Sequence, residues 1–287
     1  MSFDKRLLED FETYLDENTP KIEGFHPHFQ KALNEILKAG GKRFRPMLLL
    51  SVVDVCSPLL TQNSYPVALG LEMLHTYSLI HDDLPSMDDA DLRRGHPTLH
   101  VTYDEVTAIL AGDALNTDAF LMIANAPLSS EIRIELVKIL AQNGGSGGMV
   151  IGQAIDCEFE DRILKQDELE FLHLNKTAKL IAASLLMGAV ISELNQASRD
   201  AIYSFGLSLG LLFQIQDDII DATLSEEEAG KPTGNDEHKN SFVNLLGLEG
   251  AMEYKQKALE ALHVELKKLD KNLAKRLNII VKGYFNE

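Results

Sequence analysis

The apolar residues of this chain recur, almost from end to end, with the spacing of an α-helix. Leu7, Phe11 and Leu15, for example, lie four residues apart and therefore share one helix face. The longer segments are rich in Ala, Leu, Glu and Lys, and no convincing series of short β-branched strands interrupts them. The pattern predicts an all-α protein whose longer helices cover residues 66–83, 104–125, 129–142, 148–161, 167–190, 196–222, 248–268 and 270–284.

Glycine and proline separate the predicted helices without dividing the chain into halves. Gly40-Gly41 ends one helix, and the glycine-rich segment 144–148 separates two more. The longest polar stretch, residues 224–240, is either a domain linker or a loop over an active site. We favour the loop, because long irregular loops in compact domains tend to be functional. Since composition shifts nowhere else, we expect a single domain over residues 1–287.

Charge and cysteine content exclude several classes of protein. The 287 residues carry 27 Lys and Arg against 44 Asp and Glu, a net charge of −17, so no binding of nucleic acid is expected. The two cysteines are too few for a disulfide framework, which favours a reducing compartment. The N-terminal segment lacks the apolar core of a signal peptide, and the apolar stretches fall short of a bilayer span. We therefore expect a cytoplasmic protein with no membrane insertion.

The first of two acidic clusters follows directly after an apolar segment. Its members are Asp82, Asp83, Asp88, Asp89 and Asp91. A solvated helix end is the ordinary explanation for such a run, but here the first acids emerge from buried surface and would repel one another without a cation. Pro85 ends or kinks the helix, because it lacks an N–H and clashes with the preceding turn. The break matters because a straight helix would hold Asp82 and Asp88 about 120° apart.

The second acidic cluster lies inside residues 211–221, a segment that is apolar nearly all round. Asp217 and Asp221 share one face of the predicted helix, with Gln214 one turn earlier. Buried carboxylates need cations, which are either paired Arg and Lys side chains or divalent metal ions. We favour metal because basic residues are scarce in this chain, and oxygen-only ligands select hard ions. Neither cluster forms a calcium loop, so the two together suggest a diphosphate bridged by Mg²⁺.

Basic residues that could receive phosphate occur in small groups. Residues 40–46, GGKRFRP, put three cations beside a glycine pair, although such a string alone is more often a solvated turn. Arg93 and Arg94 are a stronger indication, because they follow the first acidic cluster at once. His75 lies seven residues before Asp82, about 20° off its face. It is either an ordinary core histidine or a member of the same cavity.

Eight motifs along the chain carry a resemblance to a known family. They are GGKRFRP, HTYSLIHDD, DDLPSMDDADLRRG, AGDALNTDAF, GGMVIGQAID, NKTAKLI, FQIQDDIID and GKPTGND. From about residue 25 to residue 270 the chain resembles the trans-isoprenyl diphosphate synthases, and it is most similar to the bacterial members that make farnesyl diphosphate. The resemblance implies a helical bundle around a deep central cavity. It also implies a prenyltransferase that condenses isopentenyl diphosphate with dimethylallyl or geranyl diphosphate.

The resemblance further implies roles for individual residues. Ligands of three Mg²⁺ ions, with Mn²⁺ as an alternative metal, would be Asp82, Asp83, Asp88, Asp217, Asp218 and Asp221. Isopentenyl diphosphate would be bound by Lys42, Arg45, His75 and Arg94. The allylic diphosphate would be bound by Arg93, Lys176, Thr177, Gln214, Lys231 and Lys239. The residues implied in catalysis are Asp82, Asp88, Asp217, Lys176 and Thr177. Gln153 and Asp156 sit in a family motif near the cavity.

Product length in this family is set by the floor beneath the first acidic cluster. Tyr77, five residues before Asp82, resembles the aromatic stop of members that make farnesyl diphosphate, while its neighbour Ser78 is small. Ordinary core packing is the alternative role for Tyr77. We therefore expect (2E,6E)-farnesyl diphosphate as product, with a geranylgeranyl or mixed short-chain synthase as the alternative.

Two other classes of protein are also considered. A terpene cyclase would use one substrate, whereas the GGK and RRG motifs beside two acidic clusters favour a transferase with two substrates. A non-catalytic partner subunit would be expected to lose acids from one cluster, and none is missing. By family analogy we expect a homodimer, although the sequence itself shows no interface.

Overall fold

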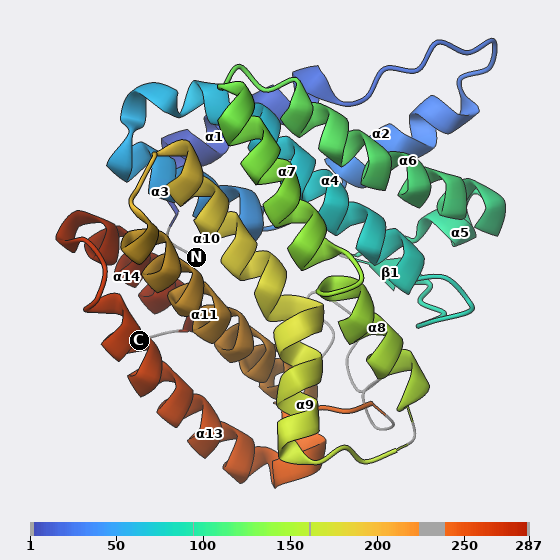
Figure 1. Ribbon diagram of the computed structural model, residues 1–287. Coiled ribbons are helices and arrows are strands. Elements are labelled where there is room, and N and C mark those ends of the chain that lie inside the picture. The colour runs from blue at the N-terminus through green and yellow to red at the C-terminus, as the bar shows by residue number, and fades with distance from the viewer. Residues whose placement is uncertain (1–2, 94, 161, 224–238, 286–287) are drawn as a thin grey trace.

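Helices make up nearly all regular structure in the computed structural model, which describes residues 3–93, 95–160, 162–223 and 239–285 (Figure 1). The predicted all-α class is confirmed. In the described residues the only strands are β1 (Leu92–Arg93) and β2 (His96–Pro97), which pair antiparallel. The α-helices are α1 (Lys5–Asn18), α2 (His28–Lys38), α3 (Phe44–Cys56), α4 (Tyr65–Asp82), α5 (Leu99–Thr102), α6 (Glu105–Ala124), α7 (Ser130–Gly144), α8 (Met149–Glu158), α9 (Gln166–His173), α10 (Lys179–Ile191), α11 (Gln196–Thr223), α13 (Phe242–Leu266) and α14 (Lys271–Phe285).

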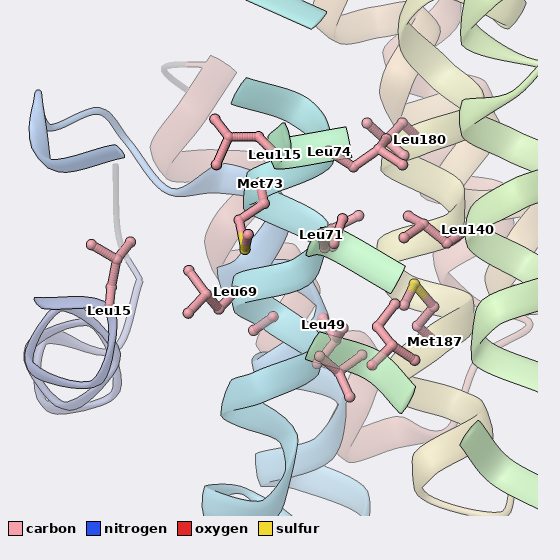
Figure 2. Packing of buried hydrophobic residues seen from close by; sticks show 14 of the residues in the cluster. Leu15, Leu49, Leu69, Leu71, Met73, Leu74, Leu115, Leu140, Leu180 and Met187 are labelled. Atoms are coloured by element: carbon pink, nitrogen blue, oxygen red, sulfur yellow. The ribbon is translucent and has the colours of Figure 1, made fainter. Parts of the chain in front are cut away.

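Helix α10 forms the centre of the bundle. Every residue of α10 except Lys179 and Leu186 is buried. A helix that is apolar on all sides needs a partner on each side, and α3, α7 and α11 surround it (Figure 1). Leu180 and Met187 of α10 belong to the same core cluster as Leu74 of α4 (Figure 2). The core therefore joins α10 to α4, the helix that ends in the first acidic cluster.

Close contact between α11 and the turn before α10 depends on glycine. A Cβ atom added to Gly210 of α11 would lie 2.3 Å from the Cα atom of Ala178, just before α10, and this contact cannot be relieved by a flexible side chain. The missing side chain lets α11 pass directly beside the turn that carries Lys176 and Thr177. As a result, the second acidic cluster lies next to these two residues.

The break predicted at Pro85 is confirmed. Helix α4 ends at Asp82, and the backbone N–H of Asp88 donates to the carbonyl oxygen of Asp82 at 2.9 Å. The chain therefore folds back on itself directly after the helix. This reversal brings Asp88 beside Asp82, where a continuous helix would have separated them.

Arg43, one of the three cations in residues 40–46, is turned into the protein. Its guanidinium donates to the carboxylates of Glu12 at 2.8 Å and Glu72 at 3.0 Å, and to the carbonyl oxygen of Leu37 at 2.9 Å. Its backbone adopts φ 46°, a left-handed conformation that precedes α3. Arg43 therefore anchors the turn before α3 and leaves Lys42 and Arg45 on either side of it.

Two of the predicted helices differ most from the structure. The single helix predicted over 167–190 is divided into α9, a π-helical turn η3 (Leu174–Ala178) and α10. Helix α13 begins at Phe242, several residues earlier than predicted, because Ser241 caps it by accepting from the N–H of Asn244. Gly247, at φ 72°, kinks this helix. Helical spacing alone carries no signal for a π turn or for an added first turn.

In the described part of the chain, two helical segments are long and apolar enough to cross a membrane by length and composition, although the apolar stretches of the sequence were expected to fall short of a bilayer span. In the segment Gln166–Ile191, 78% of the apolar window is buried inside the bundle, as expected for a core helix. In Glu105–Ala124 only 39% is buried, so part of α6 exposes apolar side chains.

Candidate active site

Two adjoining cavities occupy one end of the bundle. The first, about 710 Å³, is a polar chamber between the turn after α4, helix α8 and helix α11. The second, also about 710 Å³, is an apolar channel. The residues that line both are Asp82, Arg93, Lys176, Gln214 and Asp217. The shared wall makes the two cavities one site with a charged mouth and an apolar interior.

Both acidic clusters line the polar chamber. Asp82 and Asp88 come from the end of α4 and the turn after it, and Asp217 and Asp221 come from α11. Among the described residues, nine carboxylates but only three cationic side chains line this chamber. The structure thus brings together residues that are more than 120 positions apart, and it concentrates negative charge where they meet.

The donor set of the chamber fits Mg²⁺. Its ligands are carboxylate oxygens, which prefer hard cations. Among the described residues, no three His, Cys, Asp or Glu side chains lie close enough together to hold a metal by themselves. Mg²⁺ does not require such a group, because that ion usually takes one or two carboxylates and completes its shell with water and substrate phosphate.

Lys176 is the central cation of the site. Its Nζ atom donates to Oδ2 of Asp156 at 2.5 Å and lies 4.0 Å from Oδ2 of Asp82. Burial disfavours the charged amine, but the carboxylates of Asp82 and Asp156 outweigh it, so the pKa of Lys176 lies above its usual value. Gln153 donates to the other oxygen of Asp82 at 2.5 Å. Gln153 and Asp156, whose roles the motifs did not define, therefore position Asp82 and Lys176.

The π-helical turn η3 presents Lys176 and Thr177. Helix α8 approaches it so closely that a Cβ atom on Gly152 would lie 2.2 Å from the backbone nitrogen of Lys176. Thr177 donates its hydroxyl to Oε1 of Gln214 at 2.9 Å, which ties the turn to α11. Single π turns inside helices are frequent at functional sites, because they redirect side chains without ending the helix.

Each acidic cluster contains two adjacent aspartates, and the second of them (Asp83 or Asp218) accepts hydrogen bonds from other parts of the protein. Asp83 is only 2% exposed and accepts from Nε of Arg93 at 2.5 Å; it does not line either cavity. Burial raises the pKa of Asp83 to about 6, while the charge of Arg93 works in the opposite direction. Asp218 accepts from Gln214 at 2.8 Å and from the backbone N–H of Phe242 at 2.7 Å. Asp83 thus orients Arg93, and Asp218 joins α11 to the start of α13.

The residues expected to bind isopentenyl diphosphate are placed unequally. Arg45 and His75 both line the channel, with Nη1 of Arg45 3.1 Å from Nε2 of His75. Lys42 instead lies over the ring of Tyr284, 5.3 Å from its centroid, and lines neither cavity. Arg94 lies outside the described residues.

The expected lid is only partly described. Lys239 lines the chamber and donates to Oδ1 of Asp88 at 2.8 Å. Lys231 and the rest of 224–238 lie outside the described residues. The contact of Lys239 brings the segment before α13 across to the first acidic cluster.

Tyr77 lies in the wall of the apolar channel. Its ring meets the edge of His81 at 5.7 Å between centroids, with an interplanar angle of 82°. Ser78 also lines the channel, and its hydroxyl donates to the carbonyl oxygen of His75 at 2.7 Å. Met149 and Val150 from α8 complete this part of the wall. Tyr77 therefore lines the same channel as Asp82.

A chamber of facing carboxylates above an apolar channel, in an all-α bundle, defines an enzyme of the isoprenyl synthase class. The polyprenyl synthetase family model matches residues 26–280. The chain belongs to this family and is a prenyltransferase.

Known relatives agree on the family and differ in product. The chain is 42% identical over 268 residues to a farnesyl diphosphate synthase of Micrococcus luteus, covering 92% of this chain and 91% of that protein. It is 38% identical to geranylgeranyl pyrophosphate synthase 4 of Arabidopsis thaliana, over 92% of this chain and 71% of that protein. A solved Helicobacter pylori geranyltransferase, complexed with magnesium and isoprenyl diphosphate, matches with a TM-score of 0.93 and 48% identity over 98% and 96% of the two chains.

The contact between α8 and η3 generates a prediction. Gly152→Ala should lower kcat about a hundredfold, because the new methyl must displace the backbone of Lys176, and a shift of about 1 Å near reacting groups has an effect of that size. Steady-state kinetics on the purified variant measures it. Gly147→Ala is the matched control, since the nearest atom to its Cβ is 3.9 Å away. Equal kcat values for the two variants would contradict the prediction.

Proposed function

We propose that this protein condenses isopentenyl diphosphate with dimethylallyl and then geranyl diphosphate to give (2E,6E)-farnesyl diphosphate. The observation that carries the proposal is the meeting of two acidic clusters on facing walls of one chamber that opens into an apolar channel. A diphosphate ester of an apolar chain matches both cavities, with its charged end in the chamber. The H. pylori structure, described as a complex with magnesium and isoprenyl diphosphate, supports the same assignment.

The carboxylates of the chamber supply the metal site. Asp82 and Asp88 on one wall and Asp217 and Asp221 on the other would hold Mg²⁺, with three ions per site and Mn²⁺ as a possible substitute. When bound, the metal neutralises the charge that builds on the leaving diphosphate. Asp83 and Asp218 would act one step removed, by orienting Arg93 and the start of α13.

The cations of the chamber bind the same diphosphate. Arg93, Lys176 and Lys239 line it and would donate to phosphate oxygens, in line with their predicted role. As the bond between C1 and the diphosphate oxygen breaks, the allylic carbon gains positive charge. Thr177 and Gln214 lie on the chamber–channel boundary and would face that carbon with their oxygen atoms.

A second group of residues receives the other substrate. Arg45 and His75 line the channel, apart from the chamber, and would bind isopentenyl diphosphate. The double bond of this substrate attacks C1, forming the new carbon–carbon bond, and the adjacent carbon loses a proton to the released diphosphate. This separate basic group favours a two-substrate transferase over a terpene cyclase.

The reaction itself tests the proposal. Incubation with isopentenyl diphosphate, geranyl diphosphate and Mg²⁺ should give farnesyl diphosphate by mass spectrometry, with no activity in EDTA and recovery on addition of excess Mg²⁺. A terpene hydrocarbon formed from geranyl diphosphate alone would favour the cyclase. A twenty-carbon diphosphate as main product would favour the geranylgeranyl alternative, which the Arabidopsis relative represents.

We also propose that the protein is a cytoplasmic homodimer in which residues 1–287 form one domain. The site draws on α4, α8 and α11, so it needs most of the chain. Val106, Leu110 and Leu121 of α6 are 65%, 50% and 56% exposed, although α6 is apolar enough to resemble a membrane span. A second copy of the chain covering this face would bury these side chains.

The channel wall generates a prediction about product length. Tyr77→Ala should shift the main product from fifteen carbons to twenty or more, because removal of the ring lengthens the channel. Tyr77→Phe, which keeps the ring, should still give fifteen carbons. Chromatography of the dephosphorylated products measures the length. An unchanged product from Tyr77→Ala would assign the ring to core packing instead.

The exposed face of α6 generates a prediction about assembly. The wild-type protein should have twice the 31.9 kDa chain mass by light scattering, and Leu110→Glu should reduce it to one chain, because a charge cannot be buried without a partner. Leu59→Glu, at a side chain 94% exposed in a different part of the molecule, is the control and should remain dimeric. A wild-type monomer, or a dimeric Leu110→Glu, would contradict the prediction.

A further inference from the structure

His81, in the last turn of α4, lines the apolar channel and has no role in the mechanism above. Its side chain is only 24% exposed, so most of it is covered by protein. The imidazole contacts the ring of Tyr77, one turn earlier on α4, and it also contacts helix α6. His81 therefore connects the aromatic residue of the channel wall to a neighbouring helix.

Helix α6 accommodates the imidazole because it carries no side chain at Gly112. A Cβ atom added to Gly112 would lie no more than 3.0 Å from three atoms of the His81 ring. The Nε2 atom of the ring lies 3.1 Å from the carbonyl oxygen of Ile109. Because a carbonyl oxygen can only accept, Nε2 carries the proton and donates to α6. The close fit and the hydrogen bond together fix the imidazole against α6.

Helices α4 and α6 are themselves in close contact. Nearer the start of α4, a Cβ atom on Gly70 would lie 2.7 Å from the carbonyl oxygen of Ala119 in α6. Leu74 of α4 and Leu115 of α6 belong to the same core cluster (Figure 2). A side chain that is held between two closely packed helices has little freedom to move. The imidazole of His81 is therefore a rigid support for the group that it contacts.

That group is the ring of Tyr77, which can rotate about two side-chain bonds. The rings of Tyr77 and His81 meet with their centroids 5.7 Å apart and their planes at 82°, the edge-to-face arrangement that aromatic pairs prefer. If the imidazole were absent, the space beside Tyr77 would be open. The phenol ring could then turn out of the channel when a longer apolar chain presses against it.

We propose that His81 is a positioning residue for product length, because its imidazole, fixed against α6, holds the ring of Tyr77 in the channel wall. The inference rests on the proposed function, in which that ring limits the product to fifteen carbons. It deepens that function by adding a second residue, which acts through Tyr77 and not by blocking the growing chain itself.

The ratio of products tests the inference. With isopentenyl diphosphate, geranyl diphosphate and Mg²⁺, His81→Ala should raise the ratio of twenty-carbon to fifteen-carbon product about fivefold, the effect expected for the loss of one aromatic contact. Chromatography of the dephosphorylated products measures this ratio. His100→Ala, at a half-buried histidine of α5 outside both cavities, is the control and should keep the wild-type ratio.

Two further variants separate the aromatic contact from the hydrogen bond. His81→Phe keeps a ring beside Tyr77 but loses the donor to Ile109, and it should keep the wild-type ratio. His81→Gln keeps a donor of similar reach but lacks the ring, so it should shift the ratio as His81→Ala does. Because His81→Gln also preserves the link to α6, it decides the question if His81→Ala does not fold.

A double variant tests whether His81 acts through Tyr77. In a Tyr77→Ala background no ring remains to be held, so adding His81→Ala should change the product ratio less than about twofold. Two residues that act as one unit show such non-additive effects, whereas two independent residues have effects that combine.

The results lead to distinct conclusions. A wild-type ratio in His81→Ala and His81→Gln, even with a lower kcat, would overturn the inference and leave the proposed function intact. An equal shift in His81→Phe and His81→Gln, or a full shift in the Tyr77→Ala background, would also overturn it. A wild-type protein that consumes no isopentenyl diphosphate would overturn the proposed function as well. A shift in the Ala and Gln variants that is absent from His81→Phe and from the double variant would support the inference.

Discussion

Concentrated negative charge inside a helical bundle is the constraint on which the rest of this structure depends. Carboxylates from the end of α4, the turn after it and α11 line one chamber, and such groups repel unless cations lie between them. Lys176 and Lys239 supply part of the positive charge that is needed, because they donate hydrogen bonds to Asp156 and Asp88. The remaining excess of carboxylates explains why the same chamber suits metal ions and a diphosphate.

The apolar framework holds these charges in place. Glycine at two positions lets backbones approach closely. Gly210 allows α11 to pack against the turn before α10, and Gly152 allows α8 to pack against the backbone of Lys176. The π turn then directs Lys176 toward the chamber and Thr177 toward the channel. Much of the precision of the site therefore comes from residues that carry no functional group, because side-chain position follows backbone position.

Local patterns predicted a large part of this arrangement. Helical spacing identified the long helices, and Pro85 predicted the end of α4, because proline acts through its own ring and missing N–H. The same reasoning could not separate Arg43, which pairs with Glu12 and the buried Glu72, from Lys42 and Arg45 beside it. Nor did any local pattern mark the packing of His173 against Phe242, 69 positions later in the chain.

The sequence by itself determined the helical class, the acidic motifs and the type of ion they suit, since these follow from spacing and from the chemistry of each residue. Only the tertiary structure decided which charged groups face the cavity. Asp82 lines the chamber while its neighbour Asp83 is buried against Arg93, and no sequence pattern distinguishes two adjacent aspartates. The direction of each side chain depends on where α4 ends and what packs beside it, and those contacts come from distant parts of the chain.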